Sequence, residues 1–192
     1  MHIIAGRHRG RTLKTPKGFD TRPVLGKVRE ALFNALGDLN GIRVLDLFAG
    51  TGAVGIEALS RGAVSLTAVE AGAAQCRIIG DNLAMLGESA DIVRTDVFRA
   101  LKRLCESGRM YDLVFADPPY ETGLSQRTVL AVLASDMVAR PGLLAVTVRR
   151  REVLPGDPDW TGDALPDGCA IVFDRRYGDT RLVVYRTMAD GA

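Results

Sequence analysis

From about residue 42 onward, short apolar runs rich in β-branched residues alternate with longer segments whose apolar residues recur at helical spacing. This alternation is typical of a parallel sheet whose strands are joined by helices. The predicted strands are Arg43–Phe48, Ser65–Glu70, Asp91–Thr95, Tyr111–Ala116 and Leu143–Val148. The predicted helices are Ile56–Arg61, Ala73–Leu86, Val97–Cys105 and Ser125–Ala134, with Gly62 and Gly87 as C-terminal caps. The pattern therefore predicts a doubly wound α/β domain.

The end of the chain departs from this alternation. Two strand-like runs, Cys169–Asp174 and Arg181–Arg186, are joined by Tyr177-Gly178-Asp179-Thr180, a link too short for a crossover helix. Such a link forces the two strands to pair antiparallel. A mostly parallel, seven-stranded sheet that ends in an antiparallel hairpin is the Rossmann-like architecture of class I methyltransferases, whereas dinucleotide-binding dehydrogenases usually keep every strand parallel. Residues 149–168, with three arginines and three prolines, are predicted to form a surface loop.

Apolar residues ahead of the sheet also recur at helical spacing, between a proline and a glycine. They are Val28, Leu32, Ala35 and Leu36, with Pro23 before them and Gly37 after them. Residues 1–19 alternate irregularly, and their glycines suggest a hairpin or an extended arm. We therefore expect an N-terminal arm and helix over residues 1–37 and the main α/β domain over residues 38–192.

The composition is that of an ordinary globular protein, with 192 residues, 47% hydrophobic residues and 25% charged residues. No apolar run approaches the roughly 20 residues that a membrane-spanning helix needs. The first residues also lack the apolar core and cleavage site of a signal peptide. We therefore expect a cytoplasmic protein that does not contact a membrane.

The charge is distributed unevenly along the chain. Residues 1–29 carry eight basic residues and one acidic residue, a net charge of +7, so that the whole-chain charge of +2 leaves −5 for the remainder. A basic arm on an acidic body favours a polyanionic partner such as nucleic acid, although solvated charges are also common at chain termini. The residues that we expect to contact nucleic acid are Arg7, Arg9, Arg11, Lys14, Arg22 and Arg29.

Cysteine and histidine residues are too few and too scattered for a zinc site or a disulfide framework. The cysteines Cys76, Cys105 and Cys169 lack CxxC spacing, and the histidines His2 and His8 lie in the first eight residues. We therefore expect no metal, and we expect the chemistry of the main domain to depend on carboxylates and backbone groups.

A glycine-rich loop follows the first predicted strand, where Gly50, Gly52 and Gly55 satisfy the pattern GxGxxG. Glycines allow a tight turn and close approach of a ligand, and both dinucleotides and S-adenosylmethionine bind to such turns. Asp46 within the strand favours S-adenosylmethionine, because its carboxylate suits an ammonium group and would repel a pyrophosphate. Glu70 is placed to accept ribose hydroxyls and Asp96 to accept the adenine amino group. The expected cofactor contacts are Asp46, Phe48, Ala49, Gly50, Thr51, Gly52, Glu70, Asp96, Val97 and Asp117.

The tetrapeptide Asp117-Pro118-Pro119-Tyr120 follows the fourth predicted strand and lies at the same edge of the sheet. An exocyclic amine of a nucleobase is a poor nucleophile, because its lone pair is delocalised into the ring. The Asp117 carboxylate and the Pro118 carbonyl could accept its two hydrogens and make the nitrogen more nucleophilic. The prolines, Pro119 included, fix the backbone, and Tyr120 offers a face on which an extracted base can stack. We therefore predict these four residues as the catalytic site of an amino-methyltransferase.

Several segments together resemble the RsmD-type guanine-N2 methyltransferases of bacterial small-subunit (16S) ribosomal RNA. They are Ile3-Ile4-Ala5-Gly6-Arg7 with Gly10-Arg11, Thr21-Arg22-Pro23, Val28–Asn34, Leu45–Gly55 with Glu57–Gly62, Asp117–Tyr120 and Tyr177–Leu182. The resemblance implies a monomer that methylates the N2 amine of one guanine, on ribosomal RNA or a small-subunit assembly intermediate. It leaves open whether Arg22 binds the cofactor carboxylate or an RNA phosphate. One departure is that Ala71-Gly72 follows Glu70, where the family often has a second polar residue for the ribose.

Other functions share parts of this pattern. A DNA adenine or cytosine amino-methyltransferase would use the same tetrapeptide but usually carries a large target-recognition segment, and a basic arm disfavours a protein-glutamine methyltransferase. A nicotinamide-dependent oxidoreductase would use the glycine loop and Glu70, but it gives no role to Asp46 or to residues 117–120. A non-catalytic RNA-binding module would explain the arm alone.

Overall fold

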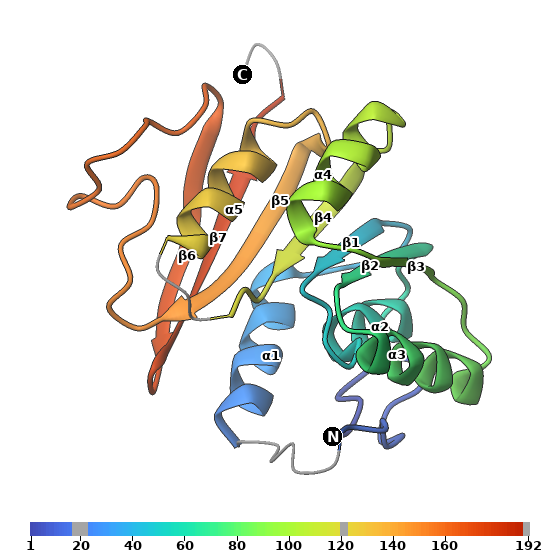
Figure 1. The fold of residues 1–192 in the computed structure, drawn as a ribbon. Coiled ribbons are helices and arrows are strands. Elements are labelled where there is room, and N and C mark those ends of the chain that lie inside the picture. Colours follow the sequence, from blue (N-terminus) through green and yellow to red (C-terminus); the bar gives the residue numbers. More distant parts are fainter. Residues whose placement is uncertain (17–22, 120–122, 190–192) are drawn as a thin grey trace.

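The computed structural model describes residues 1–16, 23–119 and 123–189, and in these residues the chain forms one mixed sheet covered by helices (Figure 1). The strands are β1 (Arg43–Leu47), β2 (Ser65–Glu70), β3 (Asp91–Arg94), β4 (Tyr111–Ala116), β5 (Val138–Arg149), β6 (Cys169–Tyr177) and β7 (Thr180–Thr187). They lie in the order β3-β2-β1-β4-β5-β7-β6. The first five strands in this order are parallel to one another, and β7 is antiparallel to both β5 and β6. The predicted doubly wound sheet with an antiparallel terminal hairpin is confirmed.

The helices are α1 (Pro23–Leu36), α2 (Ala53–Ser60), α3 (Ala73–Leu86), α4 (Val97–Glu106) and α5 (Leu124–Leu133). Each predicted helix is present, but α2 begins three residues earlier than predicted. It begins there because Gly52, at φ +76°, turns the chain directly into the helix. Gly87 caps α3 at φ +69° as predicted, whereas α2 is capped by Arg61, and Gly62 follows it at φ +108°.

Strand β5 is longer than predicted, since it begins at Val138 and not at Leu143. Pro141 has no N–H to donate to a neighbouring strand, and this argues against a strand from sequence alone. The sheet accommodates it at a register shift between β4 and β5, after Tyr111. The Gly142 N–H then donates to the Thr187 hydroxyl at 2.9 Å, so a side chain of β7 provides the acceptor for this backbone donor.

Two hydrophobic clusters cover the two faces of the sheet. One contains side chains of α1, α2 and α3, including Phe33, Ile56 and Ile79, and the other contains side chains of α4 and α5, including Leu101 and Val129. Figure 1 shows the same division, with α1, α2 and α3 on one side of the sheet and α4 and α5 on the other. The loops at the carboxyl ends of the parallel strands emerge between these two layers, and such loops usually carry the ligand site of this architecture.

The N-terminal arm is a hairpin packed against the main domain. The Ile3 N–H donates to the Arg11 carbonyl at 3.0 Å and the Leu13 N–H to the Met1 carbonyl at 2.8 Å. Ile3 and Leu13 are buried in the same cluster as α1, α2 and α3. Of the two predicted alternatives for the arm, the hairpin is therefore confirmed. Over the described ranges, the helices are all too short or too polar to cross a membrane.

Candidate active site at the carboxyl edge of the sheet

The glycine loop connects β1 to α2 and is held by bonds to its neighbours. The Ala49 N–H donates to the Val69 carbonyl of β2 at 3.0 Å, and Phe48, at φ +61°, turns the chain out of β1. A side chain at Gly55 would begin 2.6 Å from Leu66, so α2 can approach the sheet this closely only with glycine there. The loop and the first turn of α2 are thus fixed against β1 and β2.

Asp46 lies inside β1 with 1% of its surface exposed. Its Oδ2 atom accepts a hydrogen bond from the Gly55 N–H at 3.0 Å. Burial raises the pKa of this carboxyl to about 7, and the nearby charges of Asp117 and Glu70 act in the same direction. A cation placed beside Asp46 would restore the ionised form, because the charge would then be paired.

Glu70 ends β2 and joins two backbone segments. Its Oε2 atom accepts from the Gly50 N–H at 2.8 Å, and its Oε1 atom accepts from the Gly72 N–H at 2.7 Å. An ionised carboxylate has about four lone-pair positions, so each oxygen can accept a further bond. Glu70 therefore shapes the glycine loop and remains able to bind ribose hydroxyls, the role predicted from the sequence.

Asp96 is the N-cap of α4. Its Oδ1 atom accepts from the Phe98 N–H at 3.0 Å and from the Arg99 N–H at 3.3 Å. These bonds give Asp96 an ordinary capping role, and its contact with adenine stays a prediction. Val97, also predicted at the cofactor, has a buried side chain in the cluster of α4 and α5, and its contact with the cofactor stays a prediction.

Asp117 follows β4 directly, and its N–H donates to the Leu47 carbonyl of β1 at 3.4 Å. The residue keeps exposed surface, yet the protein around the carboxyl group removes it from water and raises its pKa. A hydrogen bond from the Thr147 hydroxyl to Oδ1 opposes this rise. Pro118 is buried and Pro119 is exposed, while Tyr120 lies outside the described residues.

Thr147 was not foreseen from the sequence. It lies on β5 with 4% of its surface exposed, and its hydroxyl fixes one oxygen of the Asp117 carboxylate. Its only signal in the sequence is a single hydroxyl within the apolar run from Leu143 to Val148. The contact needs β5 to lie beside β4, where Ala116 pairs with Val146.

The strand register brings the predicted acidic residues to one edge. Leu47 pairs with Val69 on one side and with Ala116 on the other, so β1, β2 and β4 end side by side. Asp46, Glu70 and Asp117 therefore share the carboxyl edge of the sheet, as the sequence predicted. The charges of Glu70 and Asp117 both raise the pKa of Asp46, which is consistent with this proximity.

Several cations of the arm are engaged within the protein. The Arg7 Nε atom lies 2.7 Å from Glu88 Oε1, and the Lys14 Nζ atom lies 3.0 Å from Asp81 Oδ2. Arg11 reaches the Met85 carbonyl at 3.4 Å, whereas Arg9 is exposed. The side chains of Arg7 and Lys14 nevertheless remain more than half exposed.

The other two predicted RNA contacts differ from the rest. Arg29 is buried, with 8% exposed, and donates to the His2 carbonyl. The structure therefore corrects its assignment, because its guanidinium group lies between α1 and the arm and not on a surface open to RNA. Arg22 lies outside the described residues.

Two buried residues that the sequence did not single out attach the arm to the main domain. Glu57 of α2 accepts from the Ile4 N–H at 2.7 Å and from the Ala5 N–H at 2.9 Å. Asn82 of α3 accepts from the Lys14 N–H at 2.7 Å and donates to the carbonyls of Lys14 at 3.1 Å and Thr51 at 3.2 Å. Asn82 thus connects the arm to the glycine loop.

Comparison with known proteins gives a consistent result over most of the chain. The sequence profile of the family described as "Conserved hypothetical protein 95" matches residues 1–186. "Ribosomal RNA small subunit methyltransferase D" of Escherichia coli K12 is 35% identical over 164 residues, which cover 84% of this chain and 81% of the relative. "Putative rRNA methyltransferase YlbH" of Bacillus subtilis is 32% identical over 191 residues, covering 97% of this chain and 98% of the relative. The solved structure "Putative methyltransferase yhhF from Escherichia coli" is 32% identical, covers 99% of both chains and has a TM-score of 0.83.

Proposed function

The chain belongs to the family described as conserved hypothetical protein 95, the RsmD family, and from this membership we propose that it methylates ribosomal RNA with S-adenosylmethionine. The proposed target is the exocyclic N2 amine of a guanine in the small-subunit RNA. The names of its relatives support a ribosomal RNA substrate, and the amine specificity rests on Asp117 and its neighbours.

The residues at the carboxyl edge fit S-adenosylmethionine. Asp46 provides a buried carboxylate for the ammonium group of the methionine portion, and Glu70 stands beside the glycine loop with free lone pairs for the ribose. A dinucleotide would place its pyrophosphate near Asp46, where the two negative charges repel. When bound, the cofactor supplies an activated methyl group on a positively charged sulfur.

The single observation that carries the proposed chemistry is the position of Asp117. Its Oδ1 atom is held by Thr147, so the carboxylate has a fixed orientation, and in the described part of the chain no hydrogen bond engages Oδ2. Oδ2 and the Pro118 carbonyl would accept the two hydrogens of the guanine amine and orient its nitrogen for in-line attack. Asp117 need not remove a proton before attack, because the nitrogen becomes acidic once it carries the methyl group. Tyr120 would stack on the extracted base.

The proposed substrate also defines the partner and the setting. We propose that the enzyme acts as a monomer, on free ribosomal RNA or on a small-subunit assembly intermediate, and thus in the cytoplasm of its cell. The exposed and surface-paired cations of the arm, Arg7, Arg9, Arg11 and Lys14, remain proposed contacts to the RNA backbone.

Mapping of methylated nucleotides tests the proposal. Ribosomal RNA from cells that lack this protein should lose one N2-methylguanine, and the purified enzyme with S-adenosylmethionine should restore it. The Asp117→Ala variant should restore none of it while still binding S-adenosylhomocysteine in a calorimeter. An unchanged methylation map, or binding of NAD without any response to S-adenosylhomocysteine, would refute the proposal.

A further inference from the structure

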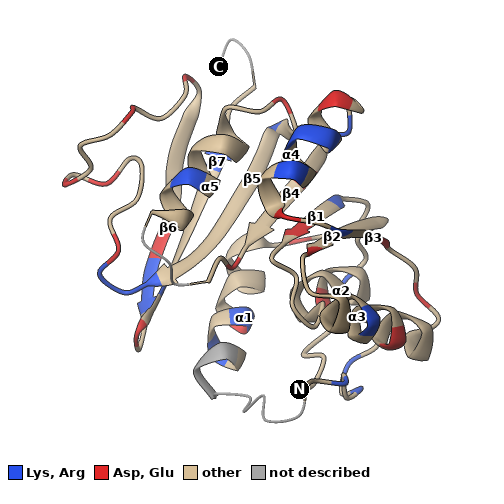
Figure 2. Cartoon of the chain, in the orientation of Figure 1, with Lys and Arg blue, Asp and Glu red and all other residues tan. Residues whose placement is uncertain are grey.

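A second group of arginines lies at the corner of the sheet beside Asp117. Strand β5 runs out into Arg149-Arg150-Arg151, and β6 ends shortly after Arg175-Arg176. The pairing of Arg149 with Thr180 and of Arg176 with Arg181 brings these segments together around the β6–β7 turn. Figure 2 shows the basic residues gathered at this end of β6 and in the adjoining loop.

This corner is close to the proposed catalytic carboxylate. Thr147, which holds Asp117, lies on β5 three residues before Arg150, the first residue after the strand, so the two are at most about 10 Å apart at 3.3 Å per residue. Arg176 lies two strands away from β5, across β7, which is again about 10 Å. An RNA strand whose target base reaches Asp117 would therefore pass within reach of these arginines.

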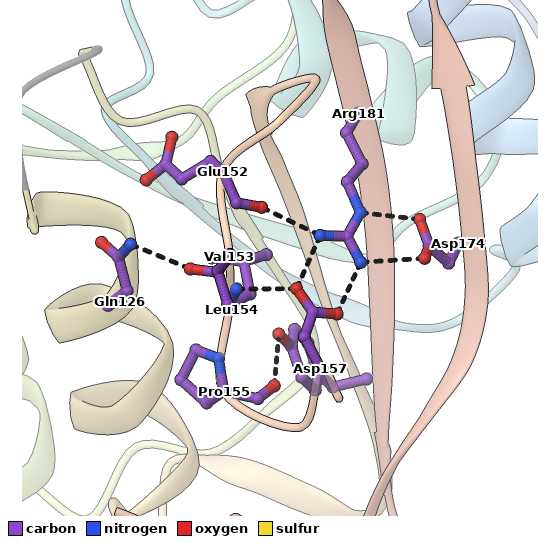
Figure 3. A network of polar contacts seen from close by, with 9 residues as sticks. Gln126, Glu152, Val153, Leu154, Pro155, Asp157, Asp174 and Arg181 are labelled. Atoms are coloured by element: carbon purple, nitrogen blue, oxygen red, sulfur yellow. Dashed lines mark hydrogen bonds and ion pairs between the residues drawn. The ribbon is translucent and has the colours of Figure 1, made fainter. Parts of the chain in front are cut away.

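The loop that carries Arg150 and Arg151 is fixed by a network centred on Arg181 (Figure 3). The guanidinium group of Arg181 binds both oxygens of Asp174 at 2.8 Å, both oxygens of Asp157 at 2.6 and 2.7 Å, and the Glu152 carbonyl at 3.0 Å. These bonds use all five of its N–H groups. Arg181 is therefore structural, and it holds the loop against β6 and β7.

Further bonds connect this loop to the helix that follows Asp117. The Gln126 side chain, in the first turn of α5, donates to the Val153 carbonyl at 2.9 Å, and the Arg150 N–H donates to the Asp179 carbonyl at 2.7 Å. The side chains of Arg150 and Arg151 thus project from a backbone whose position is set before any partner binds. Such preorganisation lowers the entropy cost of binding.

The side chains of Arg150, Arg151 and Arg176 are exposed, and none forms an ion pair within residues 1–16, 23–119 and 123–189. They line a cavity of about 200 Å³ together with Glu152, Asp157, Asp159 and Asp174. Two of these four acids, Asp157 and Asp174, already bind Arg181. The three arginines therefore remain available to an external anion, in contrast to Arg7 and Lys14 of the arm.

We propose that Arg150, Arg151 and Arg176 form a preorganised surface that binds the phosphates of the RNA strand beside the methylated guanine. Arginine suits this role because its planar guanidinium group can bind a phosphate with two hydrogen bonds. The contacts would position the strand and would not read its sequence. The identity of the partner as RNA rests on the proposed function, while the surface itself rests on the geometry of the corner.

The test compares two triple variants in binding to a 16S ribosomal RNA transcript over a range of salt concentrations. One variant is Arg150→Ala/Arg151→Ala/Arg176→Ala. The matched control is Lys102→Ala/Arg103→Ala/Arg186→Ala, which removes three exposed cations far from the corner. Arg103 lies in the last turn of α4, and Arg186 pairs with Leu143, six residues from Arg149 along β5.

We expect the first variant to bind the transcript at least about tenfold more weakly and its salt slope to fall by about 2, since each lost phosphate contact removes roughly 0.7. KM for RNA should rise while kcat at saturating RNA is retained, and the control should match the wild type. Equal affinity and equal salt slope in the two variants would overturn the proposal.

Binding of S-adenosylhomocysteine by both variants verifies that they are folded. If the wild type binds the transcript through this surface but methylates no RNA, the proposed function is refuted and the RNA-binding role of the three arginines is supported. If the wild type methylates RNA and the first variant does so with unchanged KM, the RNA-binding role of the three arginines is refuted and the proposed function is supported.

Discussion

Replacement of Thr147 by valine tests whether a single buried hydroxyl positions the proposed catalytic carboxylate. Valine has nearly the same shape, and the site is only 4% exposed, so the substitution removes the hydrogen bond to Asp117 and changes little else. A hydrogen bond to a charged group contributes about 1.5–3 kcal/mol. If that free energy is expressed in the transition state, kcat falls by about 10- to 150-fold.

The pH dependence separates this role from a merely structural one. The Thr147 bond lowers the pKa of Asp117 against the larger effect of burial, so its loss should raise that pKa further. Oδ2 accepts a hydrogen from the amine more strongly when the carboxylate is ionised, because the bond is then charge-assisted. The acidic limb of kcat/KM, measured as transfer of a labelled methyl group between about pH 5 and 9, should therefore move to higher pH.

Thr147→Ser is the matched control, because serine keeps the hydroxyl and loses only a methyl group. It should retain most of the activity and the acidic limb of the wild type. The reasoning is refuted if Thr147→Val has the turnover and pH profile of the wild type, or if Thr147→Ser and Thr147→Val are impaired to the same extent.

Three further predictions concern the cofactor loop and its contacts. Burial raises the pKa of Asp46 to about 7, so the folded protein loses stability as the pH rises from the ordinary carboxyl range and Asp46 must ionise while buried. Asp46→Asn removes this cost and should raise the melting temperature of the ligand-free protein at pH 8. The same variant should bind S-adenosylhomocysteine at least about tenfold more weakly, because the carboxylate for the ammonium group is lost. An ammonium group beside Asp46 would lower that pKa again, so calorimetry near pH 6.5 in buffers of different ionisation enthalpy should show proton release on binding, and its absence would contradict the contact. Asn82→Leu removes the bonds that join Lys14 to Thr51, so limited proteolysis should cleave the arm faster and S-adenosylhomocysteine should bind more weakly. Weaker cofactor binding with an unchanged rate of arm cleavage would argue against the connection.

The features predicted correctly from the sequence are those that depend on neighbours along the chain. Glu70 and Asp117 lie at the ends of apolar runs, and Asp46 lies within the run that forms β1, one residue before that strand ends. Parallel strands bring such ends to one edge without further information. A tight four-residue link was also enough to predict the antiparallel hairpin of β6 and β7.

The features that were missed depend on pairs far apart in sequence. Thr147 and Asp117 are 30 residues apart, and Asn82 and Lys14 are 68 apart, so no periodicity connects them. Arg29 shows the same limit in reverse. It looks like one more cation of a basic arm until the arm folds back over α1 and encloses it. Charge along the chain therefore overestimated the contribution of the arm to the exposed basic surface.

The arrangement of charge at the carboxyl edge suits two partners of opposite charge. The carboxylates of Asp46 and Glu70 lie deep against the glycine loop, where the proposed cofactor would place its ammonium group and ribose. The exposed arginines stand at the surface, where the phosphates of an RNA strand could reach them. Salt screens the exposed charges much more than the buried ones. Raising the ionic strength should therefore weaken RNA binding steeply while the affinity for S-adenosylhomocysteine changes little, and a parallel loss of both would contradict this separation by depth.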